Sequence, residues 1–160
     1  MAYIIDGNNV MGQTVGWHRD KSGSRIALLR QLAEFSRRRR IRVSVVFDGS
    51  PERNIPEGSA IEGVKVLYAE PGSDADTRIQ RLVERSLNPR GLTVVTSDRH
   101  LAFLVRARGA AVMRSGQFRK MLDDQFGDPG RVEKKDTEGV PVDEWMRYFG
   151  ALPEDDDETA

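Results

Sequence analysis

The feature that most constrains the fold is an apolar run near the amino terminus that stops abruptly at a polar turn. Tyr3, Ile4 and Ile5 are aromatic or β-branched residues, and the turn Asp6–Asn9 follows them directly. An apolar run without polar alternation is typical of a parallel strand that is buried on both faces. The run therefore predicts a central strand that delivers a carboxylate to one edge of a sheet.

Two further apolar runs end in the same way. Residues 43–47 lead into Asp48, and residues 92–96 lead into Ser97 and Asp98. Because the carboxyl ends of parallel strands share one edge of a sheet, where open α/β folds bind ligands, we expect the three aspartates to converge. A single Asp at a strand end is often only a turn former or a helix cap, but three at equivalent positions favour a shared site.

A fourth acid lies at the start of a predicted helix. The turn at residues 70–74 leads into a helix whose inner face carries apolar side chains at helical spacing. Asp74 is predicted to be the cap or a first-turn acid of this helix, and Asp76 lies in its first turn, where negative charge is favoured. Side chains two residues apart point in directions that differ by roughly 200° on a helix, so only one of these acids can face the site. We choose Asp76.

The rest of the sequence alternates predicted helices with predicted strands. Helices are expected from Ser22 or Ser24 to Arg40, from Ser97 or Asp98 to 108 and from 115 to 122, and further strands at 64–68 and 110–113. This alternation predicts an α/β fold, a three-layer α/β/α sandwich around a mostly parallel sheet with right-handed crossovers. At 160 residues the chain is long enough for one such domain and too short for two.

Charge divides the chain into two parts. Residues 1–122 hold 21 Lys and Arg against 12 Asp and Glu, and residues 123–160 hold 4 against 13, so the net charges are +9 and −9. We predict a domain over residues 1–122 and an acidic extension over 123–160, with one short helix at 142–149 and a disordered end. A basic surface around an acidic pocket suits a polyanion such as RNA. The alternative is an arginine-rich protein whose acidic tail is merely solvated.

Arginines gather near the ends of two predicted helices. A cation at a helix carboxyl end is favoured by the helix dipole, so a structural role is open beside phosphate contact. For RNA binding we predict Arg37, Arg38, Arg39, Arg40, Arg42, Arg106 and Arg108.

Composition excludes several classes of protein. The chain has no Cys, so it has neither disulfides nor a thiolate zinc site, and it has no apolar run long enough to span a membrane. The first residues read as a strand and not as a signal peptide, so we expect a cytoplasmic protein. A homodimer and a larger RNA–protein assembly both stay open.

Converging carboxylates need a counter-charge. Two carboxylates about 5 Å apart repel each other by about 3 kcal/mol at an effective dielectric of about 20. A divalent cation cancels this repulsion, and ligands that are all oxygen favour Mg²⁺ or Mn²⁺ over zinc. Such an ion binds phosphate and lowers the pKa of a bound water. We therefore predict that metal binding and phosphodiester hydrolysis are carried by Asp6, Asp48, Asp76 and Asp98.

Four short motifs resemble those of the YacP-like NYN family, a branch of the PIN-like ribonucleases. They are Asp6–Asn9, Val46–Gly49, Ala75–Ile79 and Val95–Arg99, and the resemblance covers roughly residues 2–122. It implies a PIN-like fold and a metal-dependent endoribonuclease in which the same four aspartates are metal ligands or water-positioning acids.

The resemblance also implies supporting residues beside these acids. Asn8 would be a polar support for the first aspartate, or Asn9 in its place, and we add Ser97 to this group. The chain departs from the family at position 8, where a Tyr is common, and at Gln80, where relatives tend to carry Glu. The number of metal ions is therefore left open.

Two other classes of protein deserve comparison. A receiver-like phosphoacceptor domain also has aspartates at strand ends, but it needs a second acid after the first strand and a Lys after the fifth. This chain has Gly7 and Arg114 in those regions, so that class is disfavoured. A non-catalytic RNA-binding or protein-interaction module on a nuclease-like fold is the remaining alternative, and metal-dependent cleavage would discriminate the two.

Overall fold

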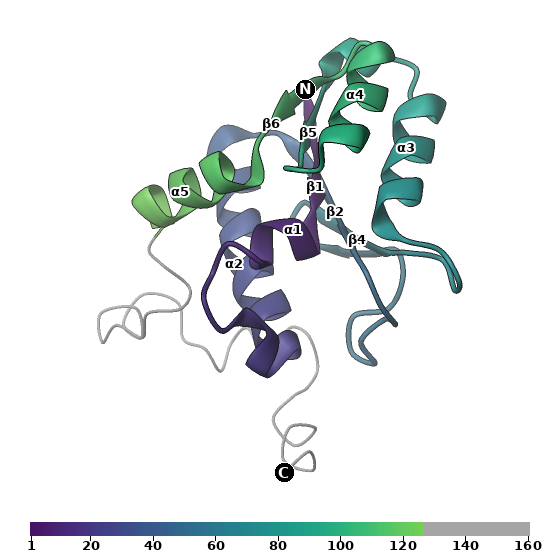
Figure 1. Ribbon diagram of the computed structural model, residues 1–160. Helices are drawn as coiled ribbons and strands as arrows, with labels where there is room; N and C mark the ends of the chain where they lie inside the picture. The colour runs from purple at the N-terminus through teal and green to yellow at the C-terminus, as the bar shows by residue number, and fades with distance from the viewer. Residues whose placement is uncertain (127–160) are drawn as a thin grey trace.

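The computed structural model describes residues 1–126, so the predicted helix at 142–149 and the acidic end lie outside the described residues. The described chain forms a six-stranded sheet in the order β3-β4-β2-β1-β5-β6 (Figure 1). Every neighbouring pair is parallel except β3 with β4, which confirms the mostly parallel sheet. The strands are β1 (Ala2–Asp6), β2 (Arg42–Phe47), β3 (Ser59–Ile61), β4 (Val64–Tyr68), β5 (Leu92–Val95) and β6 (Ala111–Met113).

Helices cover both faces of this sheet and confirm the three-layer α/β/α sandwich (Figure 1). The helices α1, α2 and α5 contact one another on one face, and α3 and α4 contact each other on the other face. Two short 3₁₀ helices, η1 (Trp17–Asp20) and η2 (Pro89–Gly91), lie in connections. The α-helices are α1 (Gly7–Met11), α2 (Lys21–Arg39), α3 (Ala75–Arg85), α4 (Arg99–Ala107) and α5 (Ser115–Phe126).

The central strand β1 is packed on both faces because successive side chains of a strand point to opposite sides. Tyr3 belongs to the core under α2 and α5. The ring centroids of Tyr3 and Phe35 are 5.2 Å apart, and those of Phe35 and Phe118 are 5.4 Å apart. Ile4 belongs to the core under α3 and α4. This double packing fixes the position of Asp6 at the end of the strand.

The fold differs from the sequence-based expectation at the turn after β1. Helix α1 begins at once at Gly7, where a polar turn was expected. The backbone there passes so close to β2 that a Cβ at Gly7 would lie 2.5 Å from Cδ1 of Phe47. Glycine therefore lets strand β1 turn directly into a helix, which brings Asn8 and Asn9 next to the neighbouring strand ends.

Helix α2 also starts differently. The expected cap at Ser22 or Ser24 is wrong, because the Oδ1 of Asp20 accepts the N–H of Gly23 at 3.0 Å and caps the helix. Ser24 instead donates to the Trp17 carbonyl at 2.9 Å. The short strand β3 was not expected either, and it pairs antiparallel with β4 at the edge of the sheet.

Helix α5 is the last described element and continues to Phe126, past the predicted domain boundary at 122. Across residues 1–126, no helix is both long enough and apolar enough to cross a membrane.

Candidate functional site

Asp6 is the buried member of the acidic site. Its side chain is only 4% exposed, and its Oδ2 accepts a hydrogen bond from Oγ1 of Thr96 at 2.9 Å. Burial raises the pKa of Asp6 to about 6, and the negative charges of Asp48 and Asp98 act in the same direction. This carboxyl group is therefore influenced by acids that follow the strands on either side of it.

Asp76 and Asp98 form a hydrogen-bonded pair between the starts of α3 and α4. Burial, the bond to Asp98 and the charge of Asp6, in that order of importance, together raise the pKa of Asp76 to about 7. Asp98 caps α4 by accepting the N–H of Leu101 at 2.9 Å, and this bond lowers its pKa. Of the two carboxyl groups, Asp76 is therefore the one that takes up a proton as pH falls through about 7.

Asp74 behaves as the sequence predicted. Its Oδ1 accepts the N–H of Thr77 at 2.9 Å, which confirms it as the cap of α3. Its side chain is exposed, whereas Asp76 turns toward Asp98 and Asp6.

Asp48 lies on the other side of Asp6, at the end of β2. Its Oδ1 accepts the N–H of Ala75 at 2.9 Å and so holds the first residue of α3, the helix that carries Asp76. Gly49 has a φ of +92°, which allows the chain to turn away immediately after the carboxylate. Asp48 therefore acts on the site in two ways, through its charge and through the position of α3.

The two asparagines of α1 hold the neighbouring turns. Oδ1 of Asn8 accepts the N–H of Asp48 at 2.9 Å, and Oδ1 of Asn9 accepts the N–H of Ser97 at 2.9 Å. Asn9 also accepts from the hydroxyl of Ser115, while Oγ of Ser97 accepts the N–H of Ser115 at 3.0 Å. Asn8 and Asn9 thus hold turns that carry an acid, whereas Ser97, which directly precedes Asp98, holds the start of α5.

Thr96 is a site residue that the sequence analysis missed. It is buried, it donates to Asp6, and its Oγ1 also accepts the N–H of Asp98 at 3.1 Å. One hydroxyl group therefore links the central acid to the start of α4. Its position at the end of an expected strand, directly before Ser97 and Asp98, was the available signal.

Arg25 of α2 is a second missed residue, and it holds the loop that begins with Asp48. Its buried guanidinium donates to the Asp48 carbonyl at 2.7 Å and to Oε2 of Glu52 at 2.7 Å. The Cζ atom of the same guanidinium lies 5.1 Å from the ring centroid of Phe47 and 5.3 Å from that of Tyr68. No periodicity distinguishes Arg25 from the other arginines of α2, so only the tertiary structure reveals it.

The predicted RNA-binding arginines fall into different environments. Arg37 and Arg38 pair with Glu34, and Arg108 pairs with Glu84 at 3.4 Å. The arginines at the end of α2 directly precede β2, so they lie at the amino-terminal edge of the sheet, opposite the edge that carries the aspartates. Arg106 lines a pocket that also contains Asp98.

The donor set suits a hard divalent cation. The side chains of the acids and of the residues that bind them offer carboxylate, amide and hydroxyl oxygens. Burial, together with the neighbouring negative charges, raises the pKa of Asp6 to about 6 and that of Asp76 to about 7, so both carboxyl groups bind protons more readily than usual. A cation would replace those protons. Within the described part of the chain, however, no three His, Asp or Glu side chains stand as a ready-made metal site.

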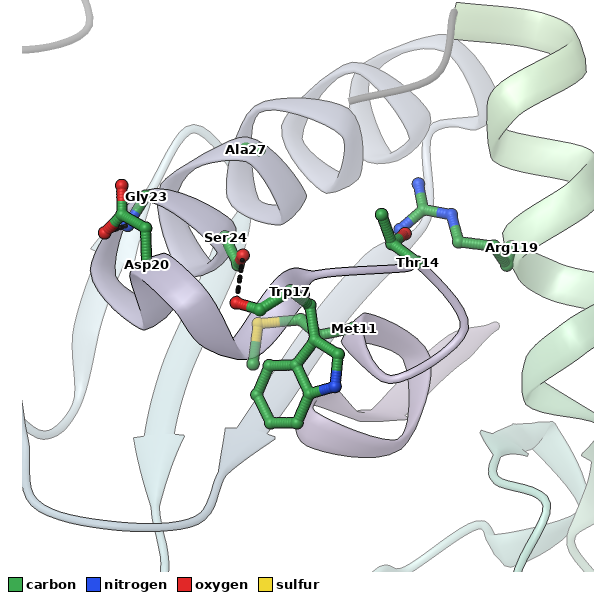
Figure 2. Close-up of a pocket in the computed structure, with 8 residues that line it drawn as sticks. All are labelled: Met11, Thr14, Trp17, Asp20, Gly23, Ser24, Ala27 and Arg119. Atoms are coloured by element: carbon green, nitrogen blue, oxygen red, sulfur yellow. Dashed lines mark hydrogen bonds between the residues drawn. The ribbon is translucent and has the colours of Figure 1, made fainter. Parts of the chain in front are cut away.

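Another pocket, of about 260 Å³, lies between α1, α2 and α5 (Figure 2). The indole of Trp17 and the thioether of Met11 lie at one side of it and Arg119 at the opposite side (Figure 2). Arg119 is buried and binds Gln31 and Asp123. None of the four site aspartates lines this pocket.

The sequence profile of the YacP-like NYN domain matches residues 3–139. This chain belongs to that family. The YacP-like NYN family has a PIN-like nuclease fold, which favours a hydrolase that acts on RNA.

Solved structures agree with the family fold. A crystal structure of a Rae1 (YacP) mutant from Bacillus subtilis is 22% identical with a TM-score of 0.61, and the match covers 99% of each chain. A second crystal structure of Rae1 (YacP) from Bacillus subtilis is 20% identical with a TM-score of 0.59, and it covers 86% of this chain and 82% of that chain. Among curated proteins, no sequence matches this YacP-like NYN chain significantly.

Proposed function

We propose that this protein is a metal-dependent endoribonuclease that hydrolyses RNA phosphodiester bonds with Mg²⁺ or Mn²⁺. The observation that carries the proposal is the meeting of Asp6, Asp76 and Asp98 at the carboxyl edge of the parallel sheet, where their charges act on one another. Asp48 completes the proposed ligand set, since only one of its carboxylate oxygens is engaged by Ala75. RNA is the proposed substrate, and the cytoplasm is the proposed setting.

The protein's own residues prepare this site. When bound, the cation would supply a counter-charge for the phosphate and a water of lowered pKa. Thr96 orients the Asp6 carboxylate through its hydroxyl proton, and Asn9 holds the turn that leads to Asp98. The pKa of Asp76 is raised to about 7, so its carboxyl group takes up a proton near that pH and can release it when a positive charge binds beside it.

The arginines would supply the attraction for RNA. Arg106 lines the same pocket as Asp98, about two helical turns along α4, so it is the one of the predicted arginines best placed to meet an RNA phosphate that continues from the acids. The other proposed contacts, at Arg37–Arg40 and Arg42, are farther from the acidic edge or paired with Glu34, so we expect them to add mainly long-range attraction. Arg108 pairs with Glu84, so it is not included among the proposed contacts.

Incubation of the purified protein with total cellular RNA, with and without Mn²⁺, tests this proposal when new 5′ ends are mapped. We expect new internal ends that require the metal and that are absent with Asp98→Asn prepared in parallel. Calorimetric titration with Mn²⁺ gives a readout besides activity, and Asp98→Asn should weaken binding of the ion. New ends at equal frequency with and without Mn²⁺, or with the variant, would contradict the assignment.

One observation favours a second candidate, a non-catalytic RNA-binding or protein-interaction module. No three ligands within residues 1–126 stand ready for a metal ion. RNA binding without cleavage in either Mg²⁺ or Mn²⁺, and without detectable Mn²⁺ binding, would establish this candidate in place of the nuclease.

A further inference from the structure

A basic groove leads away from Asp98 along α4. It has a volume of about 480 Å³ and lies between α4 and the end of β6. Asp98 lies at one end of it, and three arginines flank the rest. Its lining residues are Thr96, Ser97, Asp98, Arg99, Ala102, Arg106, Val112 and Arg114.

The fold sets the spacing of these arginines. Arg99 and Arg106 lie on one face of α4, two helical turns apart, which corresponds to about 10 Å along the helix axis. The small side chain of Ala102 lies between them. Arg114 comes directly after β6, and the pairing of Val95 with Met113 brings it level with Thr96, at the same edge as Asp98. The groove therefore has two guanidinium groups near the acids and one farther away.

These arginines are exposed and have no carboxylate partner within residues 1–126. Elsewhere in the described chain, Arg78 pairs with Glu57, Arg81 with Glu70 and Arg108 with Glu84. No ion pair joins Arg99, Arg106 or Arg114 to any acid of that region. Arg99 also occupies the first turn of α4, where the helix dipole disfavours a cation, so helix stability does not account for it.

An exposed aromatic side chain lies on the same side of α4 as two of these arginines. Phe103 is 69% exposed and lies on α4 four residues after Arg99 and three before Arg106, on the same side of the helix. Most of this ring therefore lies outside the hydrophobic core. An exposed aromatic face beside guanidinium groups can stack a base while the guanidinium groups hold the adjoining phosphates.

We propose that this groove binds the single-stranded RNA backbone on one side of the cleaved bond. Arg99 and Arg114 hold the phosphate nearest Asp98, Arg106 holds a phosphate farther along, and Phe103 stacks a base between them. Guanidinium groups suit this task because their planar fork matches two phosphate oxygens. This inference rests on the proposed function, and it adds the surface along which the RNA strand binds beside the cleaved bond.

Two neighbouring arginines provide a matched test. Arg106 and Arg108 are both exposed and lie at the end of the same helix, but only Arg106 lines the groove. We would measure binding of a labelled single-stranded oligoribonucleotide by fluorescence anisotropy over a range of salt concentrations, in EDTA so that no cleavage occurs. Thermal unfolding of each variant verifies that it is folded.

We expect Arg106→Gln, Arg99→Gln and Arg114→Gln each to weaken binding about 5- to 10-fold and to flatten the slope of log affinity against log salt by about 0.7. Phe103→Ala should weaken binding without changing that slope, whereas Arg108→Gln should stay within about 2-fold of the wild type. Equal affinities for Arg106→Gln and Arg108→Gln would overturn the groove assignment, as would a wild-type protein that binds no RNA.

Cleavage by the same preparations in Mn²⁺ separates the two claims. Groove-dependent binding without cleavage by the wild type supports the groove and contradicts the nuclease assignment. Metal-dependent cleavage combined with equal effects of Arg106→Gln and Arg108→Gln supports the nuclease and contradicts the groove.

Discussion

The backbone N–H of Asp48 donates to Oδ1 of Asn8 at 2.9 Å, so the turn after β1 holds the turn after β2. Asn9, the next residue, does the same for Ser97 after β5. Two adjacent amide side chains therefore fix the strand ends on both sides of Asp6. The short helix α1, of only five residues, therefore holds the turns that carry Asp48 and Asp98 in place beside Asp6.

The first prediction concerns these amides. Asn9→Ala removes the acceptor of both the Ser97 N–H and the Ser115 hydroxyl, so it should lower the free energy of unfolding by about 1–3 kcal/mol, because partly buried donors are left without partners. Urea denaturation measures this change. Asn9→Asp retains an acceptor at the same place and serves as the control. A loss below about 0.5 kcal/mol for Asn9→Ala would show that water replaces the amide without cost.

The second prediction is a pH dependence of stability. The folded-state pKa of Asp6 is about 6, above its ordinary value of 3.8, so the folded protein binds more protons than the unfolded chain between these two values. Stability should therefore fall as pH rises from about 4 to about 6, and Asp76, with a pKa of about 7, extends the fall toward neutral pH. Urea denaturation without metal at a series of pH values measures this slope.

The matched variant for this effect is Asp6→Asn. It should flatten the slope and stabilise the metal-free protein at pH 8 by up to about 3 kcal/mol, since each unit of pKa shift corresponds to about 1.4 kcal/mol. A variant that is less stable than the wild type at pH 8 would indicate that the Thr96 hydrogen bond outweighs the burial of the charge.

Asp98 should behave in the opposite way. Its hydrogen bond from Leu101 lowers its pKa, so the charged form stabilises the fold above its ordinary pKa, and this contribution is lost as pH falls through the lowered value. Asp98→Asn keeps a capping side chain, whereas Asp98→Ala should cost about 1 kcal/mol more in the free energy of unfolding. Both variants should lose the ability to cleave RNA. Equal free energies of unfolding for Asp98→Asn and Asp98→Ala would mean that the capping hydrogen bond does not stabilise α4.

Arg25 is predicted to position Asp48. Arg25→Met removes the donor to the Asp48 carbonyl and leaves Glu52 without its ion-pair partner, although Glu52 still accepts from the Ser22 hydroxyl. We expect the free energy of unfolding to fall by about 2–3 kcal/mol and Mn²⁺ binding to weaken. Arg25→Lys keeps the charge but not the planar fork, so it should restore part of the stability and little of the metal binding. If Mn²⁺ affinity is unchanged in Arg25→Met, the ion pair is structural only.

The sequence allowed the sheet and the approximate place of each acid to be predicted, because buried parallel strands have distinctive apolar runs that end at polar turns. Helical geometry also separated Asp76 from Asp74, and the structure turns Asp76 toward Asp98 while Asp74 caps the helix. The catalytic role of Asp76 stays a prediction. The contributions of Thr96 and Arg25 could not be predicted, because they depend on contacts between residues 90 and 23 positions apart in the chain.

The central claim is that the acids at this edge cleave RNA, and Asp76 offers its sharpest test. Asp74→Asn and Asp76→Asn replace the same carboxyl group by an amide in the same helical turn, but of the two only Asp76 is hydrogen-bonded to Asp98. Cleavage of a defined RNA by both variants and the wild type should be measured in Mn²⁺ under single-turnover conditions. We predict that Asp74→Asn cleaves within about 3-fold of the wild-type rate and that Asp76→Asn is slower by at least about 100-fold, the scale expected for loss of a catalytic group. Equal rates for the two variants would contradict the claim.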